Sequence, residues 1–219
     1  MNILVIGAGG ACGSRLAAEA EARGHAVTRA GRTGRGRELP LATNTGHPDG
    51  STWVQVDATD PAAVAAAARG HGVILGATRP ARGHEGEAGP VAADLAEGAR
   101  QARVRLVVVG GAGPLRVPGT TKQAIDDERW VPRAYRRDAA ASVDQLRALE
   151  ATRGVAWTYL APPALFEPGA RTGAYRTGGT ELVIAADGTS AISMEDFAIA
   201  ALDELETPTT HQAVLSIGS

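Results

Sequence analysis

The sequence lacks the features that mark several large classes of protein. It has a single cysteine, Cys12, which cannot form a disulfide within the chain. This fits a reducing compartment, and we expect a cytoplasmic protein. Met1 leads straight into an apolar run without the basic segment of a signal peptide. No apolar run approaches the roughly 20 residues of a membrane-spanning helix, so we expect no membrane partner.

An excess of charge is also absent. The formal net charge of -2 gives no reason to expect nucleic acid as a partner. Metal-ligand spacings are missing too, because His84, Glu85 and Glu87 fall in a polar loop without a fourth ligand at a recognised spacing. We therefore expect no bound metal and a small molecule as the partner, and leave monomer and homodimer open.

The most informative stretch is the N-terminal one. The short apolar run Ile3-Leu4-Val5-Ile6 is typical of a strand that is buried on both faces. A glycine-rich segment over 7–13 follows, and then a predicted helix over 14–23 that ends at Gly24. Strand, glycine turn and helix in this order predict a dinucleotide site, with the pyrophosphate at the start of the helix.

The glycine spacing departs from the usual G-x-G-x-x-G, which would need glycine where Cys12 stands. The chain has Gly7-x-x-Gly10-x-x-Gly13, which still allows a tight turn and a close approach of the helix. A cysteine beside a helix start could favour the thiolate, although a small residue that fits the turn is the simpler interpretation. The predicted cofactor-binding residues of this segment are Gly7, Ala8, Gly9, Gly10, Ala11, Cys12 and Gly13.

The end of the second predicted strand, over 26–30, indicates which dinucleotide binds. NAD sites place an acid there, whereas NADP sites need a cation for the 2′-phosphate. Arg32 stands at this position, and no acid occurs before Glu38. We predict NADP(H) as the cofactor, with Arg32 on the phosphate. The segment 34–51, rich in Gly, Pro, Thr and Asn, is expected to be an exposed loop.

The rest of the chain alternates strands with helices. Strands are predicted over 53–56, 72–76, 105–109, 156–160, 181–185 and 213–217, and helices over 62–69, 91–102, 138–153 and from Ser193 to about 206. This alternation predicts an α/β fold, a Rossmann-like doubly wound parallel sheet flanked by helices. We expect one domain over 1–219, with a dinucleotide-binding core over about 1–160. The irregular segment 114–137 is predicted to be a flap beside the site, and 161–219 a small substrate-side region with a loop or hairpin over 169–179.

These motifs resemble those of atypical short-chain dehydrogenases of the NmrA-like group, in particular the small NAD(P)H–flavin reductases related to biliverdin reductase B. The matching segments are 7–13, Arg32, 56–61, 105–113, 157–163 and 171–176, which span nearly the whole chain. The resemblance implies further cofactor contacts. Asp57 and Ala58 would lie by the adenine, and Ala77 and Thr78 by the nicotinamide ribose. Gly110 and Gly111 would flank the reacting ring, and Pro162 and Pro163 would close its far side.

The shortage of lysine limits the chemistry. Better-known short-chain dehydrogenases use Tyr-x-x-x-Lys to move the substrate proton, but Lys122 is the only lysine, and Ala139, Pro163 and Gly179 stand four residues after the three tyrosines. We therefore expect an acceptor that takes hydride readily and is protonated from solvent, such as a flavin or a quinone-like molecule. FMN or riboflavin would be a substrate rather than a bound prosthetic group.

The catalytic residues stay unknown at this level. Candidates are Tyr135 as a proton donor, and Arg79, Arg171, Arg176 or the backbone N–H groups near Gly111 as partners for negative charge on the reduced acceptor. The sequence thus predicts an NADPH-dependent reductase of a conjugated small molecule. Two alternatives remain open: a non-catalytic redox sensor that binds NADP(H), and a tailoring reductase or isomerase of a specialised pathway.

Overall fold

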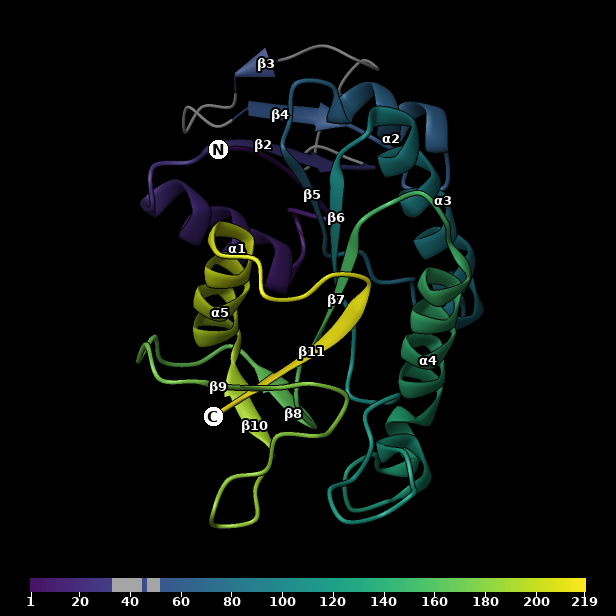
Figure 1. Ribbon diagram of the computed structural model, residues 1–219, viewed down its shortest axis with the longest axis vertical. Helices are drawn as coiled ribbons and strands as arrows, with labels where there is room; N and C mark the ends of the chain where they lie inside the picture. Colours follow the sequence, from purple (N-terminus) through teal and green to yellow (C-terminus); the bar gives the residue numbers. More distant parts are fainter. Residues whose placement is uncertain (33–44, 47–51) are drawn as a thin grey trace.

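A central sheet with helices on both faces forms the molecule (Figure 1). The computed structural model describes residues 1–32, 45–46 and 52–219, and within them the sheet order is β3-β4-β2-β1-β5-β6-β7-β11-β9. The strands are β1 (Asn2–Ile6), β2 (Ala26–Gly31), β3 (Thr45–Gly46), β4 (Thr52–Gln55), β5 (Val73–Gly76), β6 (Arg105–Val109), β7 (Trp157–Ala161), β9 (Arg176–Gly178) and β11 (Ala213–Gly218). All neighbours from β4 to β11 in this order are parallel, and the edge strands β3 and β9 are antiparallel.

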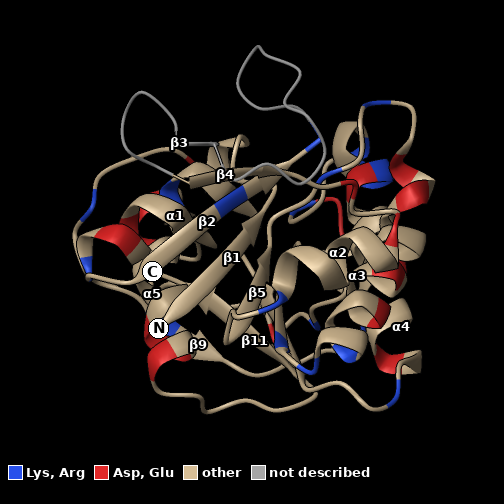
Figure 2. Cartoon of the chain, turned by 90° about the horizontal axis from the view of Figure 1, so that it is seen from above, with Lys and Arg blue, Asp and Glu red and all other residues tan. Residues whose placement is uncertain are grey.

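Helices cover both faces of the sheet (Figure 2). Helices α1 (Ala11–Ala22) and α5 (Met194–Glu206) lie on one face, and α2 (Pro61–Ala68), α3 (Ala88–Ala102) and α4 (Arg136–Ala151) lie on the other. The side chains of β1 alternate between the two cores, with Leu4 and Ile6 in one and Ile3 and Val5 in the other. Burial on both faces explains why this strand is apolar throughout.

The strand order reverses its direction at β1. The chain runs from β1 outward through β2 to β4, then returns to the other side of β1 and continues through β5, β6 and β7. This is the predicted doubly wound Rossmann-like sheet. In such a sheet a crevice opens at the carboxyl ends of the strands beside the reversal point, here between β1 and β5.

Several helices begin earlier than the sequence predicts. Helix α1 begins at Ala11, so Cys12 and Gly13 lie in its first turn, and α3 and α4 begin at Ala88 and Arg136. Glycine and irregular composition obscure these starts, because both disfavour a helix in isolation. Asp60 caps α2: its carboxylate accepts hydrogen bonds from the backbone N–H groups of Ala62 and Ala63, at 2.9 and 3.1 Å.

The substrate-side region differs most from expectation. The strand predicted over 181–185 is wrong, since Glu181 makes only an isolated bridge with Arg116. The structure instead pairs β8 (Leu165–Glu167) in parallel with β10 (Ala191–Ser193), and β9 pairs with β11 rather than closing a hairpin. Strands of three residues are too short to show a period of two. The predicted loop over 34–51 lies outside the described residues, apart from β3.

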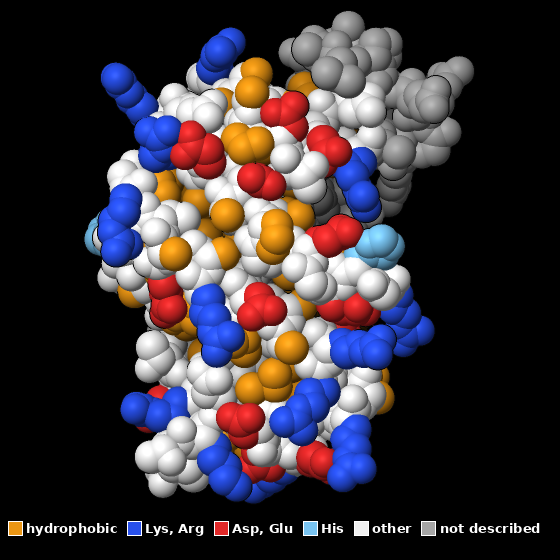
Figure 3. All heavy atoms as spheres, turned by 90° about the vertical axis from the view of Figure 1, so that its right-hand side faces the viewer, with side chains coloured by type: hydrophobic (Ala, Val, Ile, Leu, Met, Phe, Trp, Pro, Cys, Tyr) orange, Lys and Arg blue, Asp and Glu red, His pale blue; other side chains and the backbone are white. Residues whose placement is uncertain are grey.

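The outer face over α3 and α4 carries acidic and basic side chains that alternate across the surface (Figure 3). It therefore presents no extended patch of one sign. Among the helices that the structure describes, none is long and apolar enough to cross a membrane.

A buried tyrosine joins this outer layer to the sheet. The ring of Tyr159, on β7, is fully buried. It packs directly against Gly110, where a Cβ atom would lie only 1.8 Å from the Cζ atom of Tyr159. Its hydroxyl donates to the Ser142 carbonyl of α4 and accepts from the Gly111 N–H, both at 3.0 Å. Burial raises the pKa of this phenol well above its usual range. Tyr159 therefore fixes α4 against the end of β6.

We predict that Tyr159→Phe lowers the free energy of unfolding by about 1–3 kcal/mol, because it removes the two hydrogen bonds that the Tyr159 hydroxyl makes with the Ser142 carbonyl and the Gly111 N–H. Urea denaturation followed by circular dichroism measures the change. Tyr135→Phe is the control, since the Tyr135 side chain is 60% exposed. Equal stability of Tyr159→Phe and the wild type would show that the hydroxyl is not a structural link.

Candidate functional site

The glycine turn is packed too closely for side chains at two of its positions. Gly7 has a φ of +89°, and a Cβ there would lie 2.4 Å from the carbonyl oxygen of Ala77, just past β5. A Cβ on Gly13 would lie 2.2 Å from the carbonyl oxygen of Gly7. These glycines therefore let β1, the end of β5 and the start of α1 meet at one point.

The start of α1 is suited to an anion. Its N-cap is Gly10, so no side chain caps the first turn, and no acidic residue occupies that turn. The first N–H groups of a helix have no partner within the helix and carry the positive end of its dipole. A pyrophosphate fits these donors, as predicted from the sequence.

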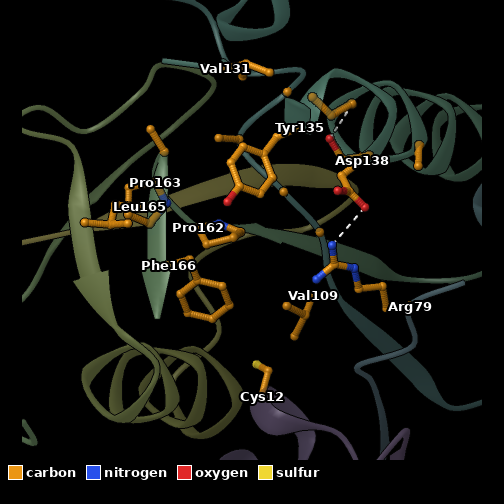
Figure 4. Close-up of a pocket in the computed structure, with 18 of the residues that line it drawn as sticks. Cys12, Arg79, Val109, Val131, Tyr135, Asp138, Pro162, Pro163, Leu165 and Phe166 are labelled. Carbon is orange, nitrogen blue, oxygen red and sulfur yellow. Dashed lines mark hydrogen bonds and ion pairs between the residues drawn. The ribbon is translucent and has the colours of Figure 1, made fainter. Parts of the chain in front are cut away.

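A cavity of about 820 Å³ extends from this helix start (Figure 4). Its walls come from the ends of β5, β6 and β7, the flap, the first turns of α4, strand β8 and the loop over 188–190. In the close-up, Tyr135 and Asp138 lie opposite Pro163 and Leu165, with Val109 and Cys12 on the side of α1. A cavity of this size accommodates a ligand of a few rings.

The structure brings together most of the predicted cofactor residues. Those that line the cavity are Gly10, Ala11, Cys12, Ala77, Thr78, Gly110, Gly111, Pro162 and Pro163. Gly7, Ala8, Gly9 and Gly13 form the turn behind its α1 end. Residues from four separate segments thus converge, which is the arrangement expected of a bound cofactor at the carboxyl ends of the strands.

The predicted adenosine contacts lie outside this cavity. Arg32 follows β2 and is exposed, and Asp57 and Ala58 follow β4, the neighbour of β2 in the sheet. Hydrogen bonds from the Thr59 N–H and hydroxyl hold the pKa of Asp57 below its usual value, with a smaller contribution from the Arg32 guanidinium. Arg32 and Asp57 therefore lie close enough to interact electrostatically, at the end of the site where the adenosine is predicted.

The four candidate catalytic residues do not form one group. Tyr135 and Arg79 line the cavity, and Arg79 makes an ion pair of 2.8 Å with Asp138. Arg171 binds Glu19 of α1 at 3.0 Å, and Arg176 donates to the carbonyl oxygen of Ser219 at 2.6 Å. Neither Arg171 nor Arg176 lines the cavity, so the geometry gives no support to a role for them there.

The hydrogen bond from Arg171 holds the pKa of the Glu19 carboxyl below its usual value. Arg23 binds the same carboxylate and also Asp203 and Glu206 of α5. This ion-pair group therefore joins α1 to α5 and the loop after β8, which is a structural task.

The backbone N–H of Gly111 is not free for the acceptor. It donates to the Tyr159 hydroxyl at 3.0 Å. The Gly111 N–H itself is therefore already paired, and the suggestion that N–H groups near Gly111 meet negative charge on a reduced acceptor stays a prediction for its neighbours. The sequence could not reveal this, because the partner lies on another strand.

Sequence reasoning missed several walls of the cavity. These are Trp130 and Val131 of the flap, Gln145 of α4, and Leu165 and Phe166 of β8. The flap was expected beside the site, but its irregular sequence gave no signal for the residues that face inward. The helical period over 138–153 places Gln145 on the buried face of the helix. Its polar side chain does not mark that face in the sequence, because buried faces are recognised by apolar residues.

The loop residues His84 and Glu87 make an exposed hydrogen bond of 2.7 Å with each other. In the part of the chain that the structure describes, no three His, Cys, Asp or Glu side chains are grouped to hold a metal ion.

The fold and the site together define a dinucleotide-binding protein of the doubly wound α/β class. A family model described as NAD(P)H-binding matches residues 7–208, and the chain belongs to this family. The uncharacterized protein YwnB of Bacillus subtilis is 34% identical over 213 residues, which are 95% of this chain and 93% of that protein.

Two solved structures are similar over the whole chain. A candidate exported protein of Burkholderia pseudomallei is 38% identical, with a TM-score of 0.85 and full coverage of both chains. A candidate NADH–flavin reductase of Streptococcus pneumoniae is 26% identical, with a TM-score of 0.80 over 100% of this chain and 99% of the other.

We predict that the Cys12 thiol of the folded protein stays protonated at physiological pH. Burial raises the pKa of this thiol to about 12, and the Arg15 guanidinium only partly opposes the effect. The thiolate absorbance near 240 nm should therefore stay absent until the pH exceeds about 10. The same protein unfolded in urea is the control, because its thiol should titrate near the ordinary value. A midpoint below 9 in the folded protein would show that the helix start outweighs burial.

Proposed function

We propose that this protein is an NADPH-dependent reductase that transfers hydride to a flavin or another planar conjugated small molecule. The observation that carries the proposal is the continuous cavity from the open start of α1 to a mainly apolar space between the flap and β8. One end suits the pyrophosphate of a dinucleotide. The other end offers ring-sized room beside Tyr135, Leu165 and Phe166.

The chain's contribution to such a reaction is to position two rings and to exclude water. Gly110 and Gly111 present backbone without side chains on one wall, and the buried Pro162 and Pro163 form a rigid wall beyond β7. The Phe166 ring packs on Phe197 of α5, with ring centroids 4.8 Å apart, which fixes the β8 side. Rigid walls of this kind supply the near-attack geometry that hydride transfer needs.

The reduced nicotinamide supplies the hydride when it is bound. The acceptor gains this hydride and one proton, and the cofactor leaves as NADP⁺. The single lysine, Lys122, does not line the cavity, so a lysine-assisted tyrosine is excluded as the proton source. Solvent is the proton source that we propose, and a conjugated acceptor tolerates this because its reduced form is a stabilised anion.

The preference for NADPH rests on Arg32. It is the cation at the carboxyl end of β2, where the 2′-phosphate of NADP would lie. The resemblance to the candidate NADH–flavin reductase of Streptococcus pneumoniae supports the acceptor class but not this choice of cofactor.

We predict that Arg32→Ala weakens NADPH binding by about tenfold or more, because it removes a charge-assisted contact to the phosphate, and leaves NADH binding unchanged. Quenching of protein fluorescence during titration measures both affinities. Arg69→Ala is the matched control, since Arg69 is also an exposed arginine but lies at the C-terminal end of α2. An equal effect of Arg32→Ala on both cofactors would contradict the assigned role.

We predict that FMN or riboflavin accelerates NADPH oxidation in stopped-flow experiments, and that Tyr135→Phe lowers this rate by less than about threefold. A general acid typically contributes about 100-fold or more, so a loss of that size would make Tyr135 the proton donor. Tight NADPH binding without oxidation by any flavin or quinone would instead favour a redox sensor or a pathway-specific acceptor.

A further inference from the structure

Helix α4 turns one polar face toward the cavity. Asp138, Ser142 and Gln145 all line it, at spacings of four and three residues, so they share one side of the helix. Gly113 allows this close approach, because its Cβ would lie 2.6 Å from the Ser142 Oγ atom. Asp138 lies toward the cavity mouth and is only half-buried, whereas Ser142 and Gln145 are 8% and 6% exposed.

Gln145 differs from the other polar side chains of this wall. Asp138 binds Arg79, and the Ser142 hydroxyl donates to the Ala139 carbonyl at 2.7 Å. The carboxamide of Gln145 makes no hydrogen bond to another described residue, and although the side chain is only 6% exposed, its amide atoms are open to the cavity. A polar group that is open to a cavity pairs with whatever fills it, water or a ligand. Because no protein group occupies it, the Gln145 amide is available to a ligand that enters the cavity.

The chemistry of the carboxamide limits that ligand. A primary amide offers a donor and an acceptor side by side, and it pairs best with a group that presents the complementary acceptor and donor. A lactam or imide edge of a planar heterocycle has this pattern, whereas a quinone offers carbonyl acceptors alone. The apolar walls beside Trp130 and Val131 suit the faces of such a ring.

We propose that the Gln145 carboxamide binds the amide or imide edge of the hydride acceptor and thereby selects heterocycles that carry a carbonyl beside an N–H. This assignment rests on the proposed reductase function. Gln145 is a binding residue for the acceptor and takes no part in the hydride or proton transfer.

The test compares wild type, Gln145→Met and the surface control Gln101→Met with three probes: riboflavin, 3-methylriboflavin, which lacks the imide N–H, and menadione, a quinone without N–H groups. Gln101 lies exposed on α3 and binds Glu97. Gln145→Met should lower kcat/KM for riboflavin by about tenfold and leave menadione reduction unchanged. The wild type should lose a similar factor on 3-methylriboflavin, and Gln145→Met should not distinguish the two flavins.

Two further measurements do not depend on turnover. Quenching of riboflavin fluorescence by the NADP⁺-saturated protein should weaken about tenfold in Gln145→Met, while NADPH affinity stays unchanged. The unfolding temperature of ligand-free Gln145→Met should stay within about 2 °C of the wild type, because the replaced amide makes no hydrogen bond within the described protein. A merely structural glutamine would give a fall instead.

The outcomes separate the two proposals. If kcat/KM for riboflavin is the same in Gln145→Met and the wild type, the role of Gln145 is overturned and the proposed reductase function stands. Riboflavin binding that depends on Gln145, without turnover, overturns the reductase and retains the binding role. Three other results each overturn the inference. They are weaker NADPH binding in Gln145→Met, equal losses of kcat/KM on riboflavin and menadione, and the absence of riboflavin binding by the wild type.

Discussion

The close contact at Gly7 is the constraint on which the rest of the structure depends. Its N–H and that of Ala8 donate to the Ala30 carbonyl of β2, at 2.9 and 3.2 Å, while Gly10 N–H donates back to the Gly7 carbonyl at 3.0 Å. The same residue touches the end of β5. One turn therefore ties β1, β2, β5 and α1 together, and a side chain at Gly7 would push the end of β5 away. That displacement would open the crevice in which both the helix start and the cavity lie.

A second constraint acts at the far wall and limits the chemistry. The end of β6 could have offered a free N–H to an anionic acceptor, but the Tyr159 hydroxyl occupies the Gly111 N–H and binds α4 at the same time. The fold thus uses this backbone donor and this phenol for packing, so neither is available to the acceptor. The Arg79 guanidinium is similarly paired with Asp138. Few polar groups remain inside for chemistry, which is consistent with an acceptor that needs little help beyond position.

The sequence predicts the fold far better than the cavity. Long apolar runs such as Ile3–Ile6 and Arg105–Val109 reveal their strands, and Asp60 with Pro61 reveals the start of α2, because each signal is local. The glycine turn and Arg32 likewise follow from local chemistry. The walls of the cavity do not, since β8 and β10 have three residues each and Trp130 lies in an irregular segment. The pairing of Tyr159 with Gly111 joins residues 48 positions apart, and no sequence period reports such a contact.

The distribution of charge over the cavity bears on the form of the acceptor. The acidic and basic side chains that line it are Arg79, Glu85, Arg129, Asp138 and Glu167. All five are at least partly exposed. Arg129 is held over the Trp130 ring, with its guanidinium carbon 4.5 Å from the ring centroid, and it donates to the Gly188 carbonyl.

The inner walls, from Val109 to Gly113 and from Pro162 to Ala164, carry no charge. A charged group on the reacting ring would therefore be desolvated without compensation, which is strongly unfavourable. The part of the acceptor that enters should be neutral before reduction, and any phosphate or carboxylate on it should stay at the rim beside the arginines. Riboflavin and FMN should then contact the same inner walls, because the phosphate that distinguishes FMN would remain in water.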